Sequence, residues 1–256
     1  MSPPDFLILG CQKGGTTSLY DLVVQHPRIH AASQKELHFF SLHYRRGWSW
    51  YAAQFPKRRR RQLWWRGLSG EATPYYLFHP LAAQRIAQHC PKAKLIVLLR
   101  DPVERALSQY FHSVRLGLET LPLEAALEAE PARLAGAEAS LSRGEAHRSH
   151  QEHSYVSRSR YGQQLDRYAQ LFPAHQLLVL RSERFFADPV GCTETVWRFL
   201  GVQPQPLQAV RASNQGRGEA AQVGPEIRAA LEAQLSGERD TMERWLRQAG
   251  PHGQPT

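Results

Sequence analysis

Three short, continuous apolar runs divide the chain, and they constrain its fold more than any other feature. The runs extend from Phe6 to Gly10 (FLILG), from Lys94 to Leu99 (KLIVLL) and from Gln176 to Leu180 (QLLVL). Unbroken apolar composition over five or six residues is typical of a parallel strand that is covered by helices on both faces. We therefore expect a buried strand at each run.

Stretches with helical spacing of apolar residues separate these runs. After the first run, Thr16 or Thr17 can cap a helix that ends before Pro27. Further helices are expected from Val103 to about Leu116, from about Arg160 to Leu171 and from about Pro189 to Leu200. Strands that alternate with helices predict an α/β, P-loop-like three-layer fold, with a central parallel sheet flanked by helices.

Length and composition favour one domain. The 256 residues, 42% of them apolar, can form a full-sized core, which we place at about residues 5–217, with a helical tail at about 225–248. The segment from about Glu128 to Ser159 lacks a strong apolar period and is expected to form helix plus mobile loop. This segment and the Trp- and Arg-rich region from Tyr44 to Arg66 are expected to shape the acceptor pocket.

Charge and cysteine content bear on partners and location. The formal charge of +9 favours anionic partners without choosing among them. The three cysteines, Cys11, Cys90 and Cys192, have no paired spacing, which favours a reducing compartment. No apolar run is long enough to span a membrane, and Asp5 precedes the first run without a basic region. We expect a cytoplasmic protein without stable membrane insertion.

The loop after the first strand is a candidate anion site. Residues 10–18 (GCQKGGTTS) lie between a strand and a helix, where backbone N–H groups and the helix dipole can hold an anion. Lys13 precedes the pair Gly14 and Gly15, and Thr16 occupies the place of the lysine in the pattern GxxxxGK[ST]. The loop is therefore not a Walker loop. The alternative is a tight turn that leaves Lys13 solvated.

The sequence KGGTTS after FLILG resembles the 5′-phosphosulfate loop of sulfotransferases that use 3′-phosphoadenosine 5′-phosphosulfate (PAPS), particularly the heparan sulfate N- and 3-O-sulfotransferases. Further blocks are similar to that family in the same order, namely Glu36 to Phe40 (ELHFF), His43 to Pro56, Gly70 to Tyr76 (GEATPYY), Pro91 to Tyr110 and Arg160 to Val202. The resemblance implies a soluble, bacterial-type member. It would move a sulfuryl group from PAPS to a hydroxyl or amine of a small-molecule or glycan acceptor and release adenosine 3′,5′-bisphosphate (PAP).

The resemblance also implies which residues bind the donor. Those around the 5′-phosphosulfate are Lys13, Gly14, Gly15, Thr16, Thr17 and Ser18. Arg100 and Ser108 would bind the 3′-phosphate, although a salt bridge of Arg100 to Asp101 or Glu104 is the alternative. Gly216 and Arg217 resemble the family's loop over the 3′-phosphate and adenine, with an ordinary solvated loop as the alternative.

Sulfuryl transfer requires in-line positioning and stabilisation of charge on the leaving oxygen, which Lys13 can supply. A hydroxyl acceptor must lose its proton, and Glu36 is the base that the resemblance implies, with a plain surface carboxylate as the alternative. His38 could assist, act instead, or be structural. No metal is expected. Ala72 stands where the family has a lysine, so the resemblance carries over the donor and the reaction, not the acceptor.

Two other functions are compatible with parts of the sequence. A nucleotide or small-molecule kinase would use a variant phosphate loop, but Lys13 ahead of the glycines and Arg100 in place of a metal-binding aspartate argue against it. A polyanion-binding module would use the basic run from Lys57 to Arg61 (KRRRR), although such runs are more often solvated loops. We expect no nucleic-acid partner, and the sequence carries no signal for an oligomeric state.

Overall fold

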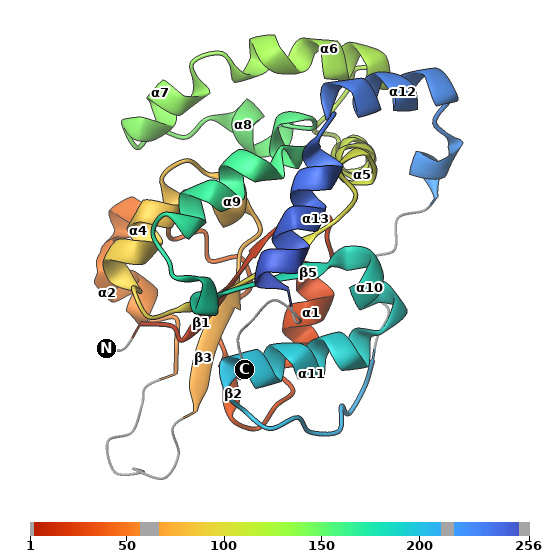
Figure 1. Cartoon of the computed structure of the whole chain (residues 1–256). Helices are drawn as coiled ribbons and strands as arrows, with labels where there is room; N and C mark the ends of the chain where they lie inside the picture. Colours follow the sequence, from red (N-terminus) through yellow and green to blue (C-terminus); the bar gives the residue numbers. More distant parts are fainter. Residues whose placement is uncertain (1–2, 57–66, 211–217, 251–256) are drawn as a thin grey trace.

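A five-stranded parallel sheet forms the centre of the fold (Figure 1). The computed structural model describes residues 3–56, 67–210 and 218–250. The strands lie in the order β2-β3-β1-β4-β5. Their bounds are Phe6–Gly10 for β1, Ile29–Ala31 for β2, Leu68–Ala72 for β3, Lys94–Leu99 for β4 and Leu177–Arg181 for β5. The predicted central parallel sheet flanked by helices is confirmed.

The three apolar runs form β1, β4 and β5, and β5 begins one residue later than predicted. The sequence analysis did not identify β2 or β3. In β3, Gly70 pairs with Phe6 of β1, and a Cβ atom at Gly70 would lie 2.5 Å from the Phe6 carbonyl oxygen. A glycine is therefore needed where these two strands approach each other.

Helices cover both faces of the sheet. Leu7 and Leu9 of β1 belong to one core cluster, whereas Phe6 and Ile8 belong to the other, which explains why the run is apolar throughout. The first face is covered by α2 (Gly47–Ala52), α3 (Tyr75–Phe78), α4 (Ala82–His89), α9 (Tyr161–Ala169) and α13 (Glu238–Ala249). The second is covered by α1 (Thr16–Val23), α10 (Ser182–Ala187) and α11 (Pro189–Leu200).

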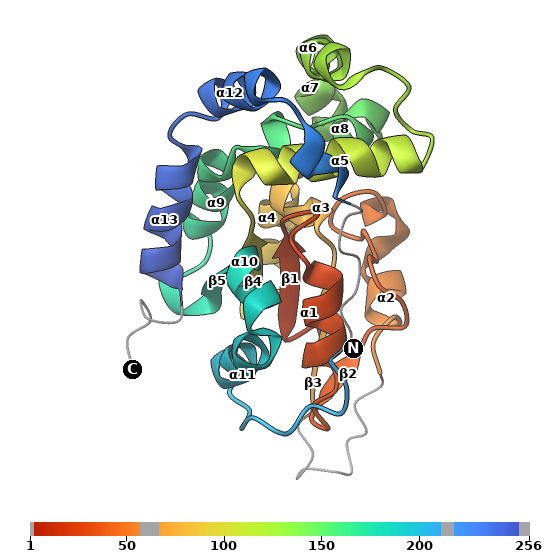
Figure 2. The same ribbon diagram turned by 90° about the vertical axis from the view of Figure 1, so that its right-hand side faces the viewer.

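A group of helices lies beyond the end of β4. The helix α5 (Pro102–Arg115) crosses above the sheet in Figure 2, with α6, α7, α8 and α12 packed around it. These helices span Leu123–Leu134, Ala137–Ser142, Arg148–Glu152 and Pro225–Gln234. Short 3-10 turns at Tyr44–Arg46, Ser157–Ser159, Ala174–Gln176 and Glu219–Gln222 complete the described elements. A third core cluster, which includes Leu107, Leu127 and Leu231, joins α5, α6 and α12.

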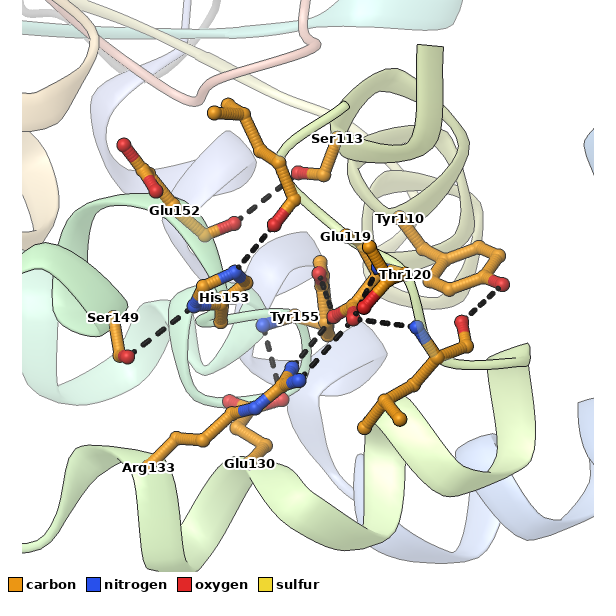
Figure 3. A network of polar contacts seen from close by, with 12 residues as sticks. Tyr110, Ser113, Glu119, Thr120, Glu130, Arg133, Ser149, Glu152, His153 and Tyr155 are labelled. Carbon is orange, nitrogen blue, oxygen red and sulfur yellow. Dashed lines mark hydrogen bonds and ion pairs between the residues drawn. The ribbon is translucent and has the colours of Figure 1, made fainter. Parts of the chain in front are cut away.

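A buried polar network fixes this group of helices to the end of α5 (Figure 3). Glu119 is ion-paired with Arg133 at 2.6 Å and accepts a hydrogen bond from the Tyr155 hydroxyl at 2.7 Å. Glu130 accepts a hydrogen bond from the Tyr155 backbone N–H at 2.9 Å. The segment predicted as helix plus mobile loop is therefore largely helical, and it is held to α5 by buried hydrogen bonds.

No helix in the described ranges combines the length and apolar character needed to cross a membrane. The cytoplasmic location and the single-domain organisation stay predictions.

Glu119 should make the stability of the protein depend on pH. Burial alone would raise the pKa of Glu119, but hydrogen bonds from Arg133, the Leu121 backbone and Tyr155 lower it to about 2, from an ordinary value of 4.5. A lowered folded-state pKa means that the stabilisation is fully present above pH 4.5 and is lost as the pH falls towards 2. We expect Glu119→Gln to reduce the free energy of unfolding at pH 7 by on the order of 2 kcal/mol.

Urea unfolding at pH 7, 4 and 3 measures this effect. The difference between wild type and Glu119→Gln should shrink as the pH falls. Glu128→Gln, which changes an exposed carboxylate on α6, is the matched control and should have little effect. An equal cost of Glu119→Gln at pH 7 and pH 3 would contradict the assignment of this stability to the ionised carboxylate.

Candidate active site

The loops after β1 and β4 line one cavity of about 580 Å³, together with residues of the segment after β2. This convergence follows from the topology, because the carboxyl ends of parallel neighbours lie at the same edge of a sheet. The lining residues are Gln12, Lys13, Gly15, Thr16, Thr17, Ser18, Glu36, Pro74, Arg100, Glu104, Ser108, His112, Glu183 and Phe186. The structure therefore brings together most of the residues predicted for the site.

The remaining predicted residues lie elsewhere. Gly14 and His38 are adjacent to lining residues but are not among them. Gly216 and Arg217 lie outside the described residues, as does the basic run from Lys57 to Arg61. The roles proposed for these residues stay predictions.

The loop between β1 and α1 makes a tight turn. Lys13 and Gly15 have positive φ angles of 69° and 93°, and Gly15 is the N-cap of α1. The Ser182 hydroxyl donates a hydrogen bond to the Gly14 carbonyl at 2.6 Å, which attaches the loop to the start of α10. The first-turn N–H groups of an α-helix have no acceptors within the helix. The start of α1, at Thr16, is therefore suited to an anion.

Positive charge gathers around this loop. Burial lowers the pKa of Lys13, and the nearby charges of Arg115 and Arg100 lower it further. In the part of the chain that the structure describes, Lys13 forms no ion pair with a carboxylate. Anion binding at this edge of the cavity would relieve the repulsion among these cations.

Arg100 forms a salt bridge with Glu104, which was the predicted alternative to binding the 3′-phosphate. Its Nη2 atom lies 4.0 Å from a carboxylate oxygen of Glu104, and its Nη1 atom donates to the Lys13 carbonyl at 3.3 Å. Glu104 is held more closely by Arg228 of α12, at 2.6 Å. The long contact to Glu104 leaves Arg100 able to bind an anion in the cavity.

Tyr161 joins the ends of β1 and β4. Its hydroxyl donates a hydrogen bond to the Arg100 carbonyl at 2.8 Å and lies 3.6 Å from the Cys11 sulfur. The Tyr161 side chain is fully buried at the start of α9. The relative position of the two loops is therefore fixed by the core beneath them.

Glu36 and His38 form a pair beside the cavity. An oxygen of the Glu36 carboxylate lies 3.5 Å from His38 Nε2, and His38 Nδ1 lies 3.2 Å from the Ser41 hydroxyl. The hydrogen bond from His38 lowers the pKa of Glu36 and outweighs the opposing effect of burial. Glu36 is therefore ionised at neutral pH and lines the cavity, whereas His38 contacts it from outside the lining.

Six residues that line the cavity were not predicted as site residues, namely Gln12, Pro74, Glu104, His112, Glu183 and Phe186. His112 follows Ser108 by four residues on α5, so helical spacing could have placed both on one face. Burial lowers the pKa of His112, and Lys13 and Arg115 lower it further. Phe186 of α10 is 44% exposed and lies beside Gly15, but no pattern in the sequence distinguishes it from a core residue.

A buried arginine supports the loop from behind. Arg158 lies with its guanidinium 5.0 Å from the ring centres of both Tyr75 and Phe78, and it donates a hydrogen bond to the Gln12 side chain. Burial lowers the pKa of Arg158 to about 9. This contact fixes the orientation of the Gln12 amide at the cavity wall.

Among the residues whose positions are described, no three or more His, Cys, Asp or Glu side chains gather in a way that could hold a metal ion. The expectation that the reaction needs no metal stays a prediction.

Comparison with known proteins identifies the family. Residues 3–215 match the family model described as the sulfotransferase domain. Heparan sulfate glucosamine 3-O-sulfotransferase 6 of Homo sapiens is 32% identical over 204 residues, which cover 78% of this chain and 53% of the relative. Membrane-associated sulfotransferase kil1 of Dictyostelium discoideum is 44% identical over 112 residues, which cover 44% of this chain and 23% of the relative. The chain thus spans about half, or less, of the length of these curated relatives.

A solved structure supports the same assignment. The crystal structure of a sulfotransferase from Alicyclobacillus acidocaldarius superimposes with a TM-score of 0.72 at 28% identity, and the match covers 95% of this chain and 97% of that one. The relatives and the structure named here are sulfotransferases, and none is a kinase. Because the family model spans most of the sequence and the fold agrees, this chain belongs to the sulfotransferase domain family.

Proposed function

We propose that the protein transfers a sulfuryl group from PAPS to a hydroxyl or amine of a small-molecule or glycan acceptor. The observation that carries this proposal is a single cavity lined by the loop after β1, by Arg100 after β4 and by the Glu36 carboxylate. A donor with anionic groups at both its 5′ and 3′ positions needs two separate cationic sites. The cavity supplies one at Lys13 and another at Arg100.

The lining residues divide into groups that match the parts of the donor. The 5′-phosphosulfate would lie against Lys13 and the start of α1, and the 3′-phosphate against Arg100 and Ser108. The exposed ring of Phe186 offers a flat apolar surface for the adenine. Gly216 and Arg217, which lie outside the described residues, would contribute to binding the 3′-phosphate and adenine, as the family resemblance implies.

The proposed reaction is an in-line displacement at sulfur. The acceptor oxygen forms a bond to sulfur, the bond between sulfur and the 5′-phosphate oxygen breaks, and PAP leaves. Lys13 stabilises the negative charge that develops on the leaving oxygen. Glu36 accepts the proton of the acceptor hydroxyl, and His38 orients its carboxylate.

Membership of the family does not by itself identify the acceptor. The Homo sapiens relative, heparan sulfate glucosamine 3-O-sulfotransferase 6, acts on heparan sulfate glucosamine according to its name. In this chain Ala72, at the position of the family's lysine, is fully buried at the end of β3. We therefore propose hydroxyl or amine groups of small molecules and glycans as the acceptor class, without restricting it to heparan sulfate.

Radiolabelled PAPS tests the reaction. The wild-type protein should transfer label to at least one member of a panel of phenols, alcohols, glycolipids and glycosaminoglycans. Lys13→Ala and Glu36→Gln should each reduce kcat by about 100-fold or more, because they remove the leaving-group cation and the base. Lys92→Ala and Glu226→Gln change exposed residues outside this cavity and serve as matched controls. Full transfer by Glu36→Gln would exclude Glu36 as the base.

The pH dependence of the reaction tests the pairing of Glu36 with His38. Glu36 must be ionised to accept a proton, so kcat/KM should fall only as the pH drops through the pKa of Glu36, below its ordinary value of 4.5. His38→Ala removes the hydrogen bond that lowers the pKa of Glu36. The acid limb of the profile should then move to higher pH. An unchanged acid limb in His38→Ala would contradict this role of His38.

A further inference from the structure

The segment from Glu36 to Leu42 follows β2 and contains two residues with positive φ angles. Glu36 and His38 have φ angles of 57° and 51°, in the left-handed region that residues with side chains enter at a cost in free energy. Such a conformation persists only where surrounding contacts enforce it. Several backbone N–H groups of this segment donate hydrogen bonds to one buried carboxyl group or to the hydroxyls that contact it.

That carboxylate is Glu71, which is fully buried on β3 and does not line the cavity. It accepts four hydrogen bonds. One comes from the Leu37 backbone N–H at 3.3 Å, between the two left-handed residues. The others come from the hydroxyls of Thr73 at 2.7 Å, Tyr51 at 2.6 Å and Tyr76 at 3.0 Å. Burial raises the pKa of Glu71, and these hydrogen bonds from neutral donors oppose that effect.

Two of these hydroxyls also accept hydrogen bonds from backbone N–H groups of the segment. The His38 N–H lies 3.5 Å from the Thr73 hydroxyl oxygen, and the Phe40 N–H lies 3.4 Å from the Tyr76 hydroxyl oxygen. A hydroxyl has one proton, and a carboxylate can only accept. Because Thr73 and Tyr76 donate their protons to Glu71, their lone pairs are left to accept from the segment.

A cation holds the same segment through its carbonyl groups. Nη1 of Arg85 donates to the carbonyls of Phe40 at 2.9 Å and Ser41 at 3.2 Å. The segment is thus held through its N–H groups by the Glu71 carboxyl and its hydroxyl partners, and through two carbonyls by Arg85. These contacts from outside add to hydrogen bonds within the segment, where the His38 carbonyl accepts from the N–H groups of Ser41 and Leu42.

We propose that Glu71 is a positioning residue for the reaction, which holds Glu36 and His38 in the geometry that the base requires. The inference rests on the proposed role of Glu36 as the base. Glu71 touches neither the cavity nor the reacting groups, so it acts through the backbone of residues 37, 38 and 40. The competing explanation is that Glu71 only stabilises the core.

Two tyrosines give a matched pair of variants that separates these explanations. Tyr51 and Tyr76 are both fully buried, and both donate to the same oxygen of Glu71. Only the Tyr76 hydroxyl also accepts a hydrogen bond from the segment. Tyr51→Phe and Tyr76→Phe therefore remove the same group from Glu71, but only the second releases the Phe40 N–H.

The first measurement needs no acceptor. Amide hydrogen exchange by NMR should show Phe40 exchanging about 10-fold faster in Tyr76→Phe than in Tyr51→Phe. The pKa of Glu36, followed through its carboxyl carbon, should rise towards 4.5 in Tyr76→Phe as its contact with His38 loosens. Equal changes in the two variants, or none in either, would overturn the inference.

The second measurement uses the acceptor found with the radiolabelled panel. Tyr76→Phe should lower kcat by about 10- to 100-fold with little change in the binding of PAP, whereas Tyr51→Phe should lower it less than about 3-fold. Glu71→Gln should retain more activity than Glu71→Ala, because its amide oxygen can still accept from Leu37 and Thr73. Equal losses of kcat in the two phenylalanine variants would contradict the proposal. Absence of transfer by wild type would contradict the proposed function alone, since the exchange measurement decides the role of Glu71.

Discussion

The parallel pairing of β1 with β3 on one side and β4 on the other is the constraint on which the site depends. In this register Ile8 is opposite both Ala72 and Ile96, so the three strands end at one edge of the sheet. The loop from Cys11 to Gly15 leaves β1 there, and Arg100 follows β4. The Glu36 N–H donates to the Ala72 carbonyl at 3.1 Å, which attaches Glu36 to the end of β3. A shift in any of these pairings would separate the cations from the carboxylate.

Two buried arginines behind the β1 loop are the second feature of this edge, whose cavity is lined by the cations Lys13 and Arg100 and by three glutamates. Arg105 and Arg158 are fully buried behind the loop, and their hydrogen bonds go to hydroxyl, amide and carbonyl groups. Within the described ranges neither forms an ion pair. Buried cations of this kind are costly unless an anion is close. Burial lowers the pKa of both arginines, and the charge of the nearby Glu130 opposes that effect.

Local patterns in the sequence were sufficient for the parts of the fold that are buried on both faces. The apolar runs that form β1, β4 and β5, and the glycine loop after β1, need no information from distant residues. The strand β3 could not be found this way, because Ser69, Gly70 and Glu71 interrupt any apolar run between Leu68 and Ala72. That carboxylate is tolerated in the core only because Tyr51, Thr73 and Tyr76 donate to it, and two of these partners come from outside the strand and its turn. His112 was within reach of helical spacing from Ser108, whereas Phe186 enters the site only through tertiary packing.

The proposed function requires that two anion sites, at Lys13 and at Arg100, bind the 5′ and 3′ groups of the same nucleotide. Isothermal titration calorimetry with PAP and with AMP tests this, because the two ligands differ only by the 3′-phosphate. We expect PAP to bind about 10- to 100-fold more tightly than AMP, as one charge-assisted phosphate contact would give, and we expect Arg100→Ala to remove that difference while AMP binding is kept. Equal affinity of the wild-type protein for PAP and AMP would contradict the account.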